Sequence, residues 1–578
     1  MGGAALSFAC ISVKRLRRLP VLTARRVRAH AMVMMCFEIV RCLPSSASAA
    51  AVLSLDFQAQ GLQSVAYDGT QLLKKGQPRV RRIVWNTGEV FGVPENYIPQ
   101  TTFDEKTHRV EQKWSMGQLV CVYRPVKNKL NLKLTFTNTS NRGIRSVEIG
   151  VMDLVFPETP TGSGWYRHLH CTSDAVDDVA AVIADYGSGT LAAVGENFEQ
   201  EFRLALHKDF EHVKPGYNLV VATIARSTTD FIHVDGPQLE PRQSVTFDIS
   251  LRFGPPKSAL GDLARDVFSG YERRYPRVLQ WADRRPIAAL MLASPAEQHR
   301  SATNPRGWLN DPKIDVTTPK GKAVFRKKVI AWASRSVSQC RLRGAQGVIV
   351  WDIEGEEFPP IVFVGDPRML PQLAPEFDAV ADEFFKRFTD AGLKTGICIR
   401  PSRIARSNPS KAKSQWRHNH MAFDPVEEMA AKIQYAKKRW SCSLFYIDSN
   451  VTWAFAGKEV ESRRGEPESW VMRAHAMRRL ATLCPDVLII PEHQYTGYYS
   501  HVSGYKELRG GFASTPERVL LAYRDAFSVI NVADGKLAER RADLVRAVRR
   551  GDILMFRGWF PSRENAMVQS IYREAADK

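Results

Sequence analysis

The sequence predicts a multidomain protein in which an antiparallel β-sandwich precedes a (β/α)8 barrel. Three observations support this fold class. The chain has 578 residues, more than one ordinary hydrophobic core organises. Residues 52–255 alternate apolar and polar side chains over short segments, as half-buried antiparallel strands do. Residues 286–578 instead alternate short apolar runs with helical stretches, which is typical of parallel β/α units.

Composition excludes several other classes of protein. Hydrophobic residues make up 44% of the chain and charged residues 25%, as in globular proteins rather than disordered or multi-span membrane proteins. The formal net charge is +20, but the basic residues do not interleave with aromatic ones as they do in a nucleic-acid-binding surface. We therefore expect no nucleic-acid partner and no integral membrane segment. The sequence indicates no particular oligomeric state.

Residues 1–51 are predicted to be a leader rather than part of a folded domain. A basic stretch from Lys14 to Arg28 precedes a short apolar stretch at 31–37 and an Ala-x-Ala exit at 47–49. This order is typical of a secretory signal peptide, so we expect a periplasmic or extracellular protein. The alternative is a disordered basic leader.

The sandwich and the segment after it are predicted from residues 52–285. Alternating segments such as 130–138, 219–224 and 245–253 indicate two packed sheets, each with one buried face. Pro255 and Pro256 end this domain. Residues 256–285 are a predicted helical linker, because apolar side chains recur on one side of residues 259–275.

The barrel prediction for residues 286–578 rests on seven apolar runs in one series. So many β/α units favour a (β/α)8 barrel over an open doubly wound sheet. An eighth strand is not evident, and residues 361–364 are the candidate for it. The seven runs are 287–293, 348–351, 395–399, 444–447, 487–490, 529–532 and 553–556, and the predicted helices include 377–391, 425–439, 470–483 and 538–549.

Two acids at the ends of successive apolar runs are the predicted catalytic pair. Asp448 follows the fourth run and Glu492 the fifth, and active sites of such barrels lie at the carboxyl ends of the strands. Neighbouring strands lie about 4.8 Å apart, close to the roughly 5–5.5 Å between the two carboxyls of a retaining glycosidase. One carboxylate would attack the anomeric carbon, and the other would protonate the leaving oxygen. Asp534, after the sixth run, is a further candidate acid.

Other side chains at these strand ends are predicted to bind the sugar. Aromatic faces pack against sugar C–H groups, and acids, Arg and amides bind hydroxyls. A single acid at a strand end is more often a helix cap or a surface charge, so the prediction rests on the joint pattern over six strand ends. The predicted sugar-binding residues are Trp351, Asp352, Glu354, Arg400, Asn450, Trp453, His493, Gln494, Tyr495, Arg557 and Trp559.

No cofactor or metal is expected. No Gly-rich phosphate loop follows any of the apolar runs. The nine cysteines contain no CxxC spacing, so a structural zinc site has no support. His493 and His501 lack HxH or HExxH spacing, and we expect them to support other groups by hydrogen bonding.

The predicted sandwich, linker helix and barrel with Tyr446-Ile-Asp448 after the fourth run resemble the retaining glycoside hydrolases that act on α-linked sugars, and the sandwich resembles their supersandwich domain. In the α-amylase-like and endo-α-N-acetylgalactosaminidase-like groups, the nucleophile is an Asp after strand four and the acid/base a Glu after strand five. The resemblance implies these roles for Asp448 and Glu492. In the α-galactosidase-like groups the acid follows strand six, which Asp534 matches. The α-amylase pattern has Arg where this sequence has Tyr446.

The expected function is therefore hydrolysis of an α-linked oligo- or polysaccharide with retention of configuration. The sequence indicates neither the sugar nor endo or exo action. The alternative is a non-catalytic carbohydrate-binding or scaffold protein on a glycosidase-like barrel.

Overall fold

A computed structural model describes residues 52–577, with gaps at 60, 94–97, 163–168, 175–176, 209–215, 224–225, 228–231, 234–238, 295, 352, 355–364, 402, 407–415, 420–424, 449–450, 453–469, 534–535 and 559–562. The predicted leader lies outside the described residues, and so does the segment 361–364 that was the candidate eighth strand. Residues Ala51–Lys578 form one compact unit.

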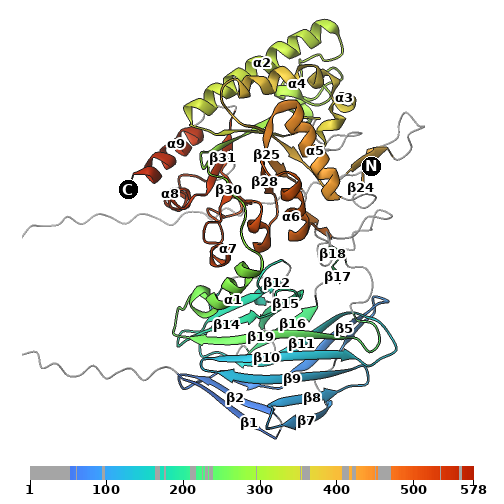
Figure 1. Cartoon of the computed structure of the whole chain (residues 1–578), viewed down its shortest axis with the longest axis vertical. Helices are drawn as coiled ribbons and strands as arrows, with labels where there is room; N and C mark the ends of the chain where they lie inside the picture. The colour runs from blue at the N-terminus through green and yellow to red at the C-terminus, as the bar shows by residue number, and fades with distance from the viewer. Residues whose placement is uncertain are drawn as a thin grey trace, which may run out of the picture. The chain divides into compact units, whose positions relative to one another are not determined.

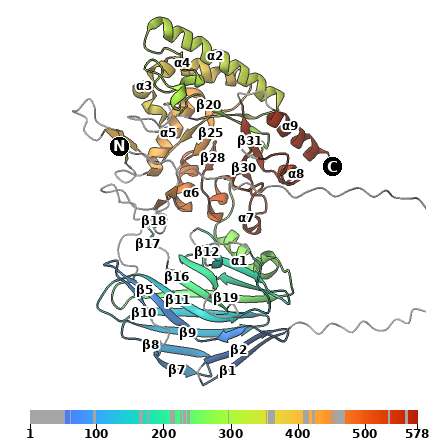
Figure 2. The same cartoon turned by 180° about the vertical axis from the view of Figure 1, so that it is seen from behind.

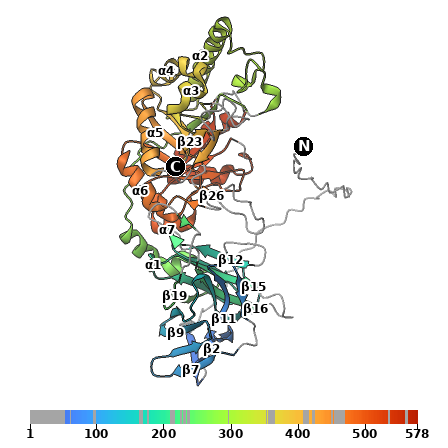
Figure 3. The ribbon, with the colours of Figure 1, turned by 90° about the vertical axis from the view of Figure 1, so that its right-hand side faces the viewer.

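Two antiparallel sheets form the amino-terminal sandwich (Figure 1), as the alternating pattern predicts. In Figure 3, β19 and β9 of the first sheet lie on one side and β16 and β11 of the second on the other. The first sheet runs β13 (Ala181–Asp185), β14 (Thr190–Gly195), β19 (Ser244–Gly254), β10 (Lys129–Asn138), β9 (Gly117–Val126), β8 (Arg109–Lys113) and β7 (Gln100–Asp104). The second runs β12 (Leu169–Asp174), β15 (Phe202–Lys208), β16 (Gly216–Thr223), β11 (Ile144–Val155), β5 (Arg79–Trp85) and β6 (Val90–Gly92), with β4 (Leu73–Lys75) paired to β11.

Strand β10 shows how the alternation builds the sandwich. Leu130, Leu132 and Leu134 are buried in the core between the sheets, whereas Lys129 and Lys133 face away from it. This period of two follows from the pleat of a strand. A smaller antiparallel sheet precedes the sandwich and contains β1 (Leu53–Gln58), β2 (Gly61–Tyr67) and β3 (Thr70–Gln71).

The predicted linker helix is α1 (Leu260–Arg274). A buried arginine joins it to the sandwich: Arg252 on β19 donates to the Leu263 carbonyl oxygen at 2.8 Å and to Asp266 Oδ2 at 3.0 Å. Loop residues before β13 in turn contact the barrel, since Asp177 Oδ2 accepts from Arg473 Nε at 3.0 Å and from the Ala474 backbone N–H at 2.7 Å. The domain boundaries at residues 255 and 285 remain predictions.

Eight parallel strands form the barrel sheet, which confirms the predicted fold class (Figure 2). Its edge strands β28 and β29 approach each other, because the Ser503 backbone N–H donates to the Ile489 carbonyl oxygen at 3.1 Å. In chain order the strands are β20 (Ile287–Met291), β21 (Gly347–Trp351), β22 (Thr395–Ile399), β25 (Cys442–Ile447), β28 (Leu488–Pro491), β29 (Gly504–Glu507), β30 (Ser528–Asn531) and β31 (Ile553–Arg557).

The strand that the sequence did not reveal is β29, the sixth in chain order. It pairs in parallel with β30 from Gly504↔Ser528 to Glu507↔Asn531. It contains Lys506 and Glu507 and only one large apolar side chain, so it lacks the continuous apolar run expected of a buried parallel strand. As a result, the sixth and seventh predicted runs are strands seven and eight of the barrel.

The helices match the predicted ones within a few residues, except that residues 470–471 form a strand. The longest, α2, stands beside α4 on the outside of the barrel (Figure 1). The helices are α2 (Pro319–Leu342), α3 (Leu370–Leu373), α4 (Pro375–Thr389), α5 (Pro425–Trp440), α6 (Ala474–Leu483), α7 (Glu517–Ala522), α8 (Arg541–Arg550) and α9 (Arg563–Ala576). Two-stranded pairs are β17 (Arg226–Ser227) with β18 (Ile232–His233), β23 (Arg403–Arg406) with β24 (Trp416–Asn419), and β26 (Val451–Thr452) with β27 (Trp470–Val471). Of the helices described, none is both long and apolar enough to cross a lipid bilayer.

Candidate active site

The barrel interior determines which strand-end side chains point inward. A separate core cluster inside the barrel includes Cys398, Tyr446, Ile490 and Tyr505. Because side chains alternate along a strand, the residue two positions further along each strand continues the same inward-facing row. Those residues are Arg400, Asp448, Glu492 and Glu507, which therefore share the carboxyl end of the barrel.

Strand register brings the three predicted residues Arg400, Asp448 and Glu492 to the same level. Ile399 pairs with Ile447, and Ile447 with Pro491. The next residues continue the ladder: the Asp448 N–H donates to the Ile399 carbonyl oxygen at 2.9 Å and the Glu492 N–H to that of Ile447 at 2.8 Å. The backbones of neighbouring residues in this row thus lie one strand spacing apart, about 4.8 Å, as the sequence predicts for Asp448 and Glu492.

An ion pair orients the carboxylate of Asp448. Arg400 donates to Asp448 Oδ2 from Nη2 at 2.8 Å and from Nε at 3.1 Å. Both side chains are mostly shielded, with 17% of Arg400 and 19% of Asp448 exposed, so solvent screens the pair less than it would at the surface. Two donors on one oxygen restrict rotation of the carboxylate.

Two hydrogen bonds fix the backbone of Arg400. Lys432 on α5 is fully buried and donates from Nζ to the Arg400 carbonyl oxygen at 2.8 Å. Burial lowers the pKa of Lys432 to about 8. On the other side, the Arg400 N–H donates to the Gly365 carbonyl oxygen at 3.2 Å. Gly365 has φ +58°, and a Cβ there would lie 2.5 Å from the Arg400 nitrogen, so this close approach requires glycine.

His493 lies among the acids of the rim. Its Nε2 is 3.7 Å from Glu492 Oε2, and 46% of the imidazole and 33% of the Glu492 side chain are exposed. Partial burial lowers the pKa of His493, and the carboxylates of Asp448 and Glu507 act in the opposite direction. His493 therefore lies beside the predicted acid/base Glu492, and its hydrogen-bonding role stays a prediction.

Glu507 is the acid that sequence reasoning missed. It ends strand six, and its Oε1 accepts from the Tyr505 hydroxyl at 3.3 Å. Tyr505 in turn accepts from Asn531 Nδ2 at 2.9 Å. The spacing of the predicted runs gave no signal for this strand, because the interval between the fifth and sixth runs is no longer than the intervals between the earlier ones.

Aromatic rings lie beneath the acids. Trp351 and Tyr446 have ring centroids 5.0 Å apart, and Tyr446 and Tyr505 are 4.9 Å apart in an edge-to-face arrangement. Burial raises the pKa of Tyr446 well above its ordinary value, and Glu492 and Asp448 add to the shift. Tyr446 therefore stays a neutral hydrogen-bonding group below the two carboxylates. Trp351 is half-buried, so part of its ring is accessible.

Glu354 does not reach the rim, although it was predicted to bind the sugar. Only 1% of the residue is exposed, and neither carboxylate oxygen makes a well-formed hydrogen bond to a described residue. Burial raises its pKa to about 7, Asp366 adds to the shift and Lys432 opposes it. Arg368 binds Asp366 Oδ2 at 2.7 Å and also Glu428. Glu354 thus belongs to a buried charged cluster beside Lys432.

The burial of Glu354 predicts a pH-dependent stability. Its folded-state pKa lies above the ordinary 4.5, so its contribution is complete below about pH 4.5 and is lost as the pH rises through about 7. We expect the melting temperature of Glu354→Gln, relative to the unsubstituted chain, to rise by a few degrees between pH 5 and pH 8. Thermal unfolding monitored by circular dichroism measures this. The exposed Glu517→Gln is the control, and an equal pH response in both variants would contradict the prediction.

The remaining predicted residues divide into three groups. Gln494 accepts from the Tyr505 backbone N–H and so ties the end of β28 to β29, while Tyr495 packs edge-on against Tyr498 at 5.8 Å and Arg557 is exposed at the end of β31. Tyr498 and the neighbouring Tyr499 are fully buried and serve packing. Asp352, Asn450, Trp453, Asp534 and Trp559 lie outside the described residues.

The strand order contradicts the proposed match of Asp534 to the acid after strand six. The strand that precedes it in sequence is β30, which is strand seven of the barrel and not strand six. Its correspondence to an acid after strand six is therefore wrong, because β29 was not recognised. Within the described ranges, no group of three or more His, Cys, Asp or Glu side chains could hold a metal ion.

In the described part of the chain, an antiparallel sandwich is followed by a (β/α)8 barrel, with inward-facing acids at the ends of barrel strands four, five and six. No protein-family model matches the sequence, and no curated protein matches it. Solved structures do match. A quadruple mutant of the α-N-acetylgalactosaminidase NagBb from Bifidobacterium bifidum aligns with a TM-score of 0.52 and 11% identity, over 90% of this chain and 91% of that one.

Two more solved structures also align with this chain. NagBb in complex with GalNAc aligns with a TM-score of 0.50, 11% identity and the same coverage. An α-galactosidase from Lactobacillus brevis aligns with a TM-score of 0.39 and 11% identity, over 91% of this chain and 74% of that one. The two NagBb structures show that the chain shares their fold from the sandwich through the barrel.

Proposed function

We propose that this protein is a glycoside hydrolase that cleaves an α-linked oligo- or polysaccharide with retention of configuration. The observation that carries the proposal is the register that sets Asp448 and Glu492 side by side at the carboxyl ends of strands four and five, with Arg400 bound to Asp448. The fold shared with NagBb, named as an α-N-acetylgalactosaminidase, supports it.

The proposed reaction has two displacements. A carboxylate oxygen of Asp448 attacks the anomeric carbon while Glu492 gives a proton to the leaving oxygen, so that a glycosyl ester forms on Asp448. Glu492 then takes a proton from water, which attacks the same carbon and releases the sugar with its original configuration. Arg400 holds the Asp448 carboxylate in place for the attack. Trp351 offers an aromatic surface to the sugar ring.

A panel of nitrophenyl α-glycosides that includes the α-N-acetylgalactosaminide tests this function. We expect release of nitrophenol from at least one member, and nuclear magnetic resonance should show the α-anomer as the first product. A β-anomer as the first product would exclude retention. Binding on an array of α-linked glycans without hydrolysis of any substrate would instead favour the non-catalytic alternative.

We also propose that the protein is exported, on the basis of the basic, apolar and Ala-x-Ala segments in residues 14–49. The expected mature chain from the native host begins at or near Ala50. Amino-terminal sequencing of the purified protein measures this, and cytosolic protein that begins at Met1 would contradict it.

A further inference from the structure

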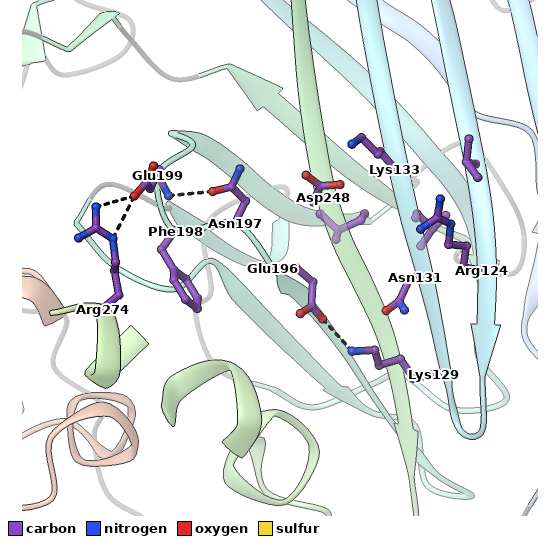
Figure 4. A pocket seen from close by; sticks show the side chains of 13 residues that line it. Arg124, Lys129, Asn131, Lys133, Glu196, Asn197, Phe198, Glu199, Asp248 and Arg274 are labelled. Carbon is purple, nitrogen blue, oxygen red and sulfur yellow. Dashed lines mark hydrogen bonds and ion pairs between the residues drawn. The ribbon is translucent and has the colours of Figure 1, made fainter. Parts of the chain in front are cut away.

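A pocket of about 630 Å³ lies in the amino-terminal half of the protein and is formed only by the sandwich and α1 (Figure 4). Its floor is the first sheet, on the face opposite the core. This follows from β10, where Leu130 and Leu132 point into the core and Asn131 and Lys133 therefore point outward. The volume falls in the range of small-molecule sites, about 300–1,000 Å³.

Strand register places complementary polar groups beside one another on this floor. Asn131 pairs with Arg124 of β9, and Lys133 pairs with Asp248 of β19. Directly opposed residues on one sheet face have Cβ atoms about 4.5–5.5 Å apart. The floor thus combines two cations, an amide and a carboxylate within the span of a single sugar ring or two.

The walls of the pocket are held by interactions of their own (Figure 4). Glu196 accepts from Arg252 Nη2 at 2.7 Å and from Lys129 Nζ at 3.2 Å. Arg274 donates from Nη2 to Glu199 Oε1 at 2.7 Å. Phe198, which is half-buried, packs edge-on against Tyr271 with centroids 5.4 Å apart. Glu196 and Phe198 are therefore held in place without a ligand, which lowers the entropic cost of binding.

The floor side chains, in contrast, are not engaged. Arg124, Asn131, Lys133 and Asp248 make no side-chain hydrogen bond or ion pair with any residue in the described part of the chain. They offer donors and acceptors together, so neither a simple anion nor a simple cation satisfies them all. Hydroxyl groups both donate and accept, and Phe198 adds an apolar surface beside them.

We propose that this pocket is a second carbohydrate-binding site, which holds one or two sugar units of an oligosaccharide without cleaving it. Arg124 and Lys133 donate to sugar oxygens, and Asp248 accepts from sugar hydroxyls. The choice of ligand class is strengthened by the proposed function, but the binding itself requires no catalysis. Such a site would keep a long glycan on the protein between cleavage events.

The test uses the full chain with Asp448→Asn, so that no substrate is consumed, and an array of α-linked oligosaccharides as the probe. We expect the double substitution Arg124→Ala/Asp248→Ala to reduce the array signal several-fold, to the level that binding at the barrel rim alone gives. A matched charge pair in the exposed turn between β7 and β8, Glu105→Ala/Lys106→Ala, should leave it unchanged. Circular dichroism confirms that each variant is folded.

The outcomes separate this proposal from the proposed function. Introduced into the otherwise unsubstituted chain, Arg124→Ala/Asp248→Ala should leave hydrolysis of nitrophenyl glycosides intact, because these small substrates need only the barrel rim. Equal array binding by the pocket variant and the control would overturn the second site, and so would absence of any array signal from the Asp448→Asn chain. Loss of array binding in the pocket variant of a chain that hydrolyses nothing would uphold the site and reject the glycosidase.

Discussion

Replacement of Asp448 by Asn should abolish hydrolysis, with a loss in kcat/KM of about a thousandfold or more, or roughly 4 kcal/mol of transition-state stabilisation. Asn has nearly the same shape as Asp but lacks the charge of the attacking carboxylate. Steady-state kinetics on the best nitrophenyl α-glycoside measures the effect. The substitution keeps an oxygen that can accept from Arg400, so we expect the fold and sugar binding to survive.

The matched control is Asp486→Asn, because Asp486 is 77% exposed and pairs only with Lys437 among the described residues. It should retain wild-type kinetics. Activity of Asp448→Asn close to that of the control would remove Asp448 from the mechanism, whereas loss of activity together with loss of the circular dichroism spectrum would point to misfolding. In that case Asp448→Glu, which keeps the charge but moves it, should fold and remain at least a hundredfold slower.

The second large effect identifies the acid/base. Glu492→Ala should slow cleavage of substrates with poor leaving groups by about 10²–10⁴-fold, but should spare the first step for a dinitrophenyl glycoside, whose leaving group needs no proton. The glycosyl-enzyme should then accumulate, and added azide should restore turnover as a glycosyl azide of retained configuration. Mass spectrometry of the trapped enzyme and nuclear magnetic resonance of the product measure both steps.

The structure adds Glu507 as a competitor in this experiment. Glu492 follows β28, the strand next to that of Asp448, whereas Glu507 ends β29, one strand further along. A separation of one strand matches the roughly 5–5.5 Å of a retaining pair better than two do, so we expect rescue with Glu492→Ala alone. Azide rescue of Glu507→Ala or of Asp534→Ala instead would show that the assignment of Glu492 is wrong. The exposed Glu517→Ala should behave as wild type.

Much of the barrel was predictable because most of its strands are continuous apolar runs in the sequence. Runs such as 395–399 and 444–447 are apolar on both faces, as strands covered by helices on one side and by the barrel interior on the other must be. The adjacency of Asp448 and Glu492 followed as well, because successive β/α units place their strands side by side. The order of runs along the chain was therefore enough to bring these two acids together.

The sequence by itself determined two patterns: apolar and polar residues alternate with a period of two in the first half, and apolar runs alternate with helical stretches in the second. These patterns predicted the sandwich, the barrel and the acids that end strands four and five. Only the tertiary structure decided that Gly504–Glu507 is a strand, because its conformation comes from parallel pairing with β30 rather than from its own side chains. It also decided that Glu354 is buried beside Lys432. Both outcomes depend on segments distant in sequence, which local periodicity does not encode.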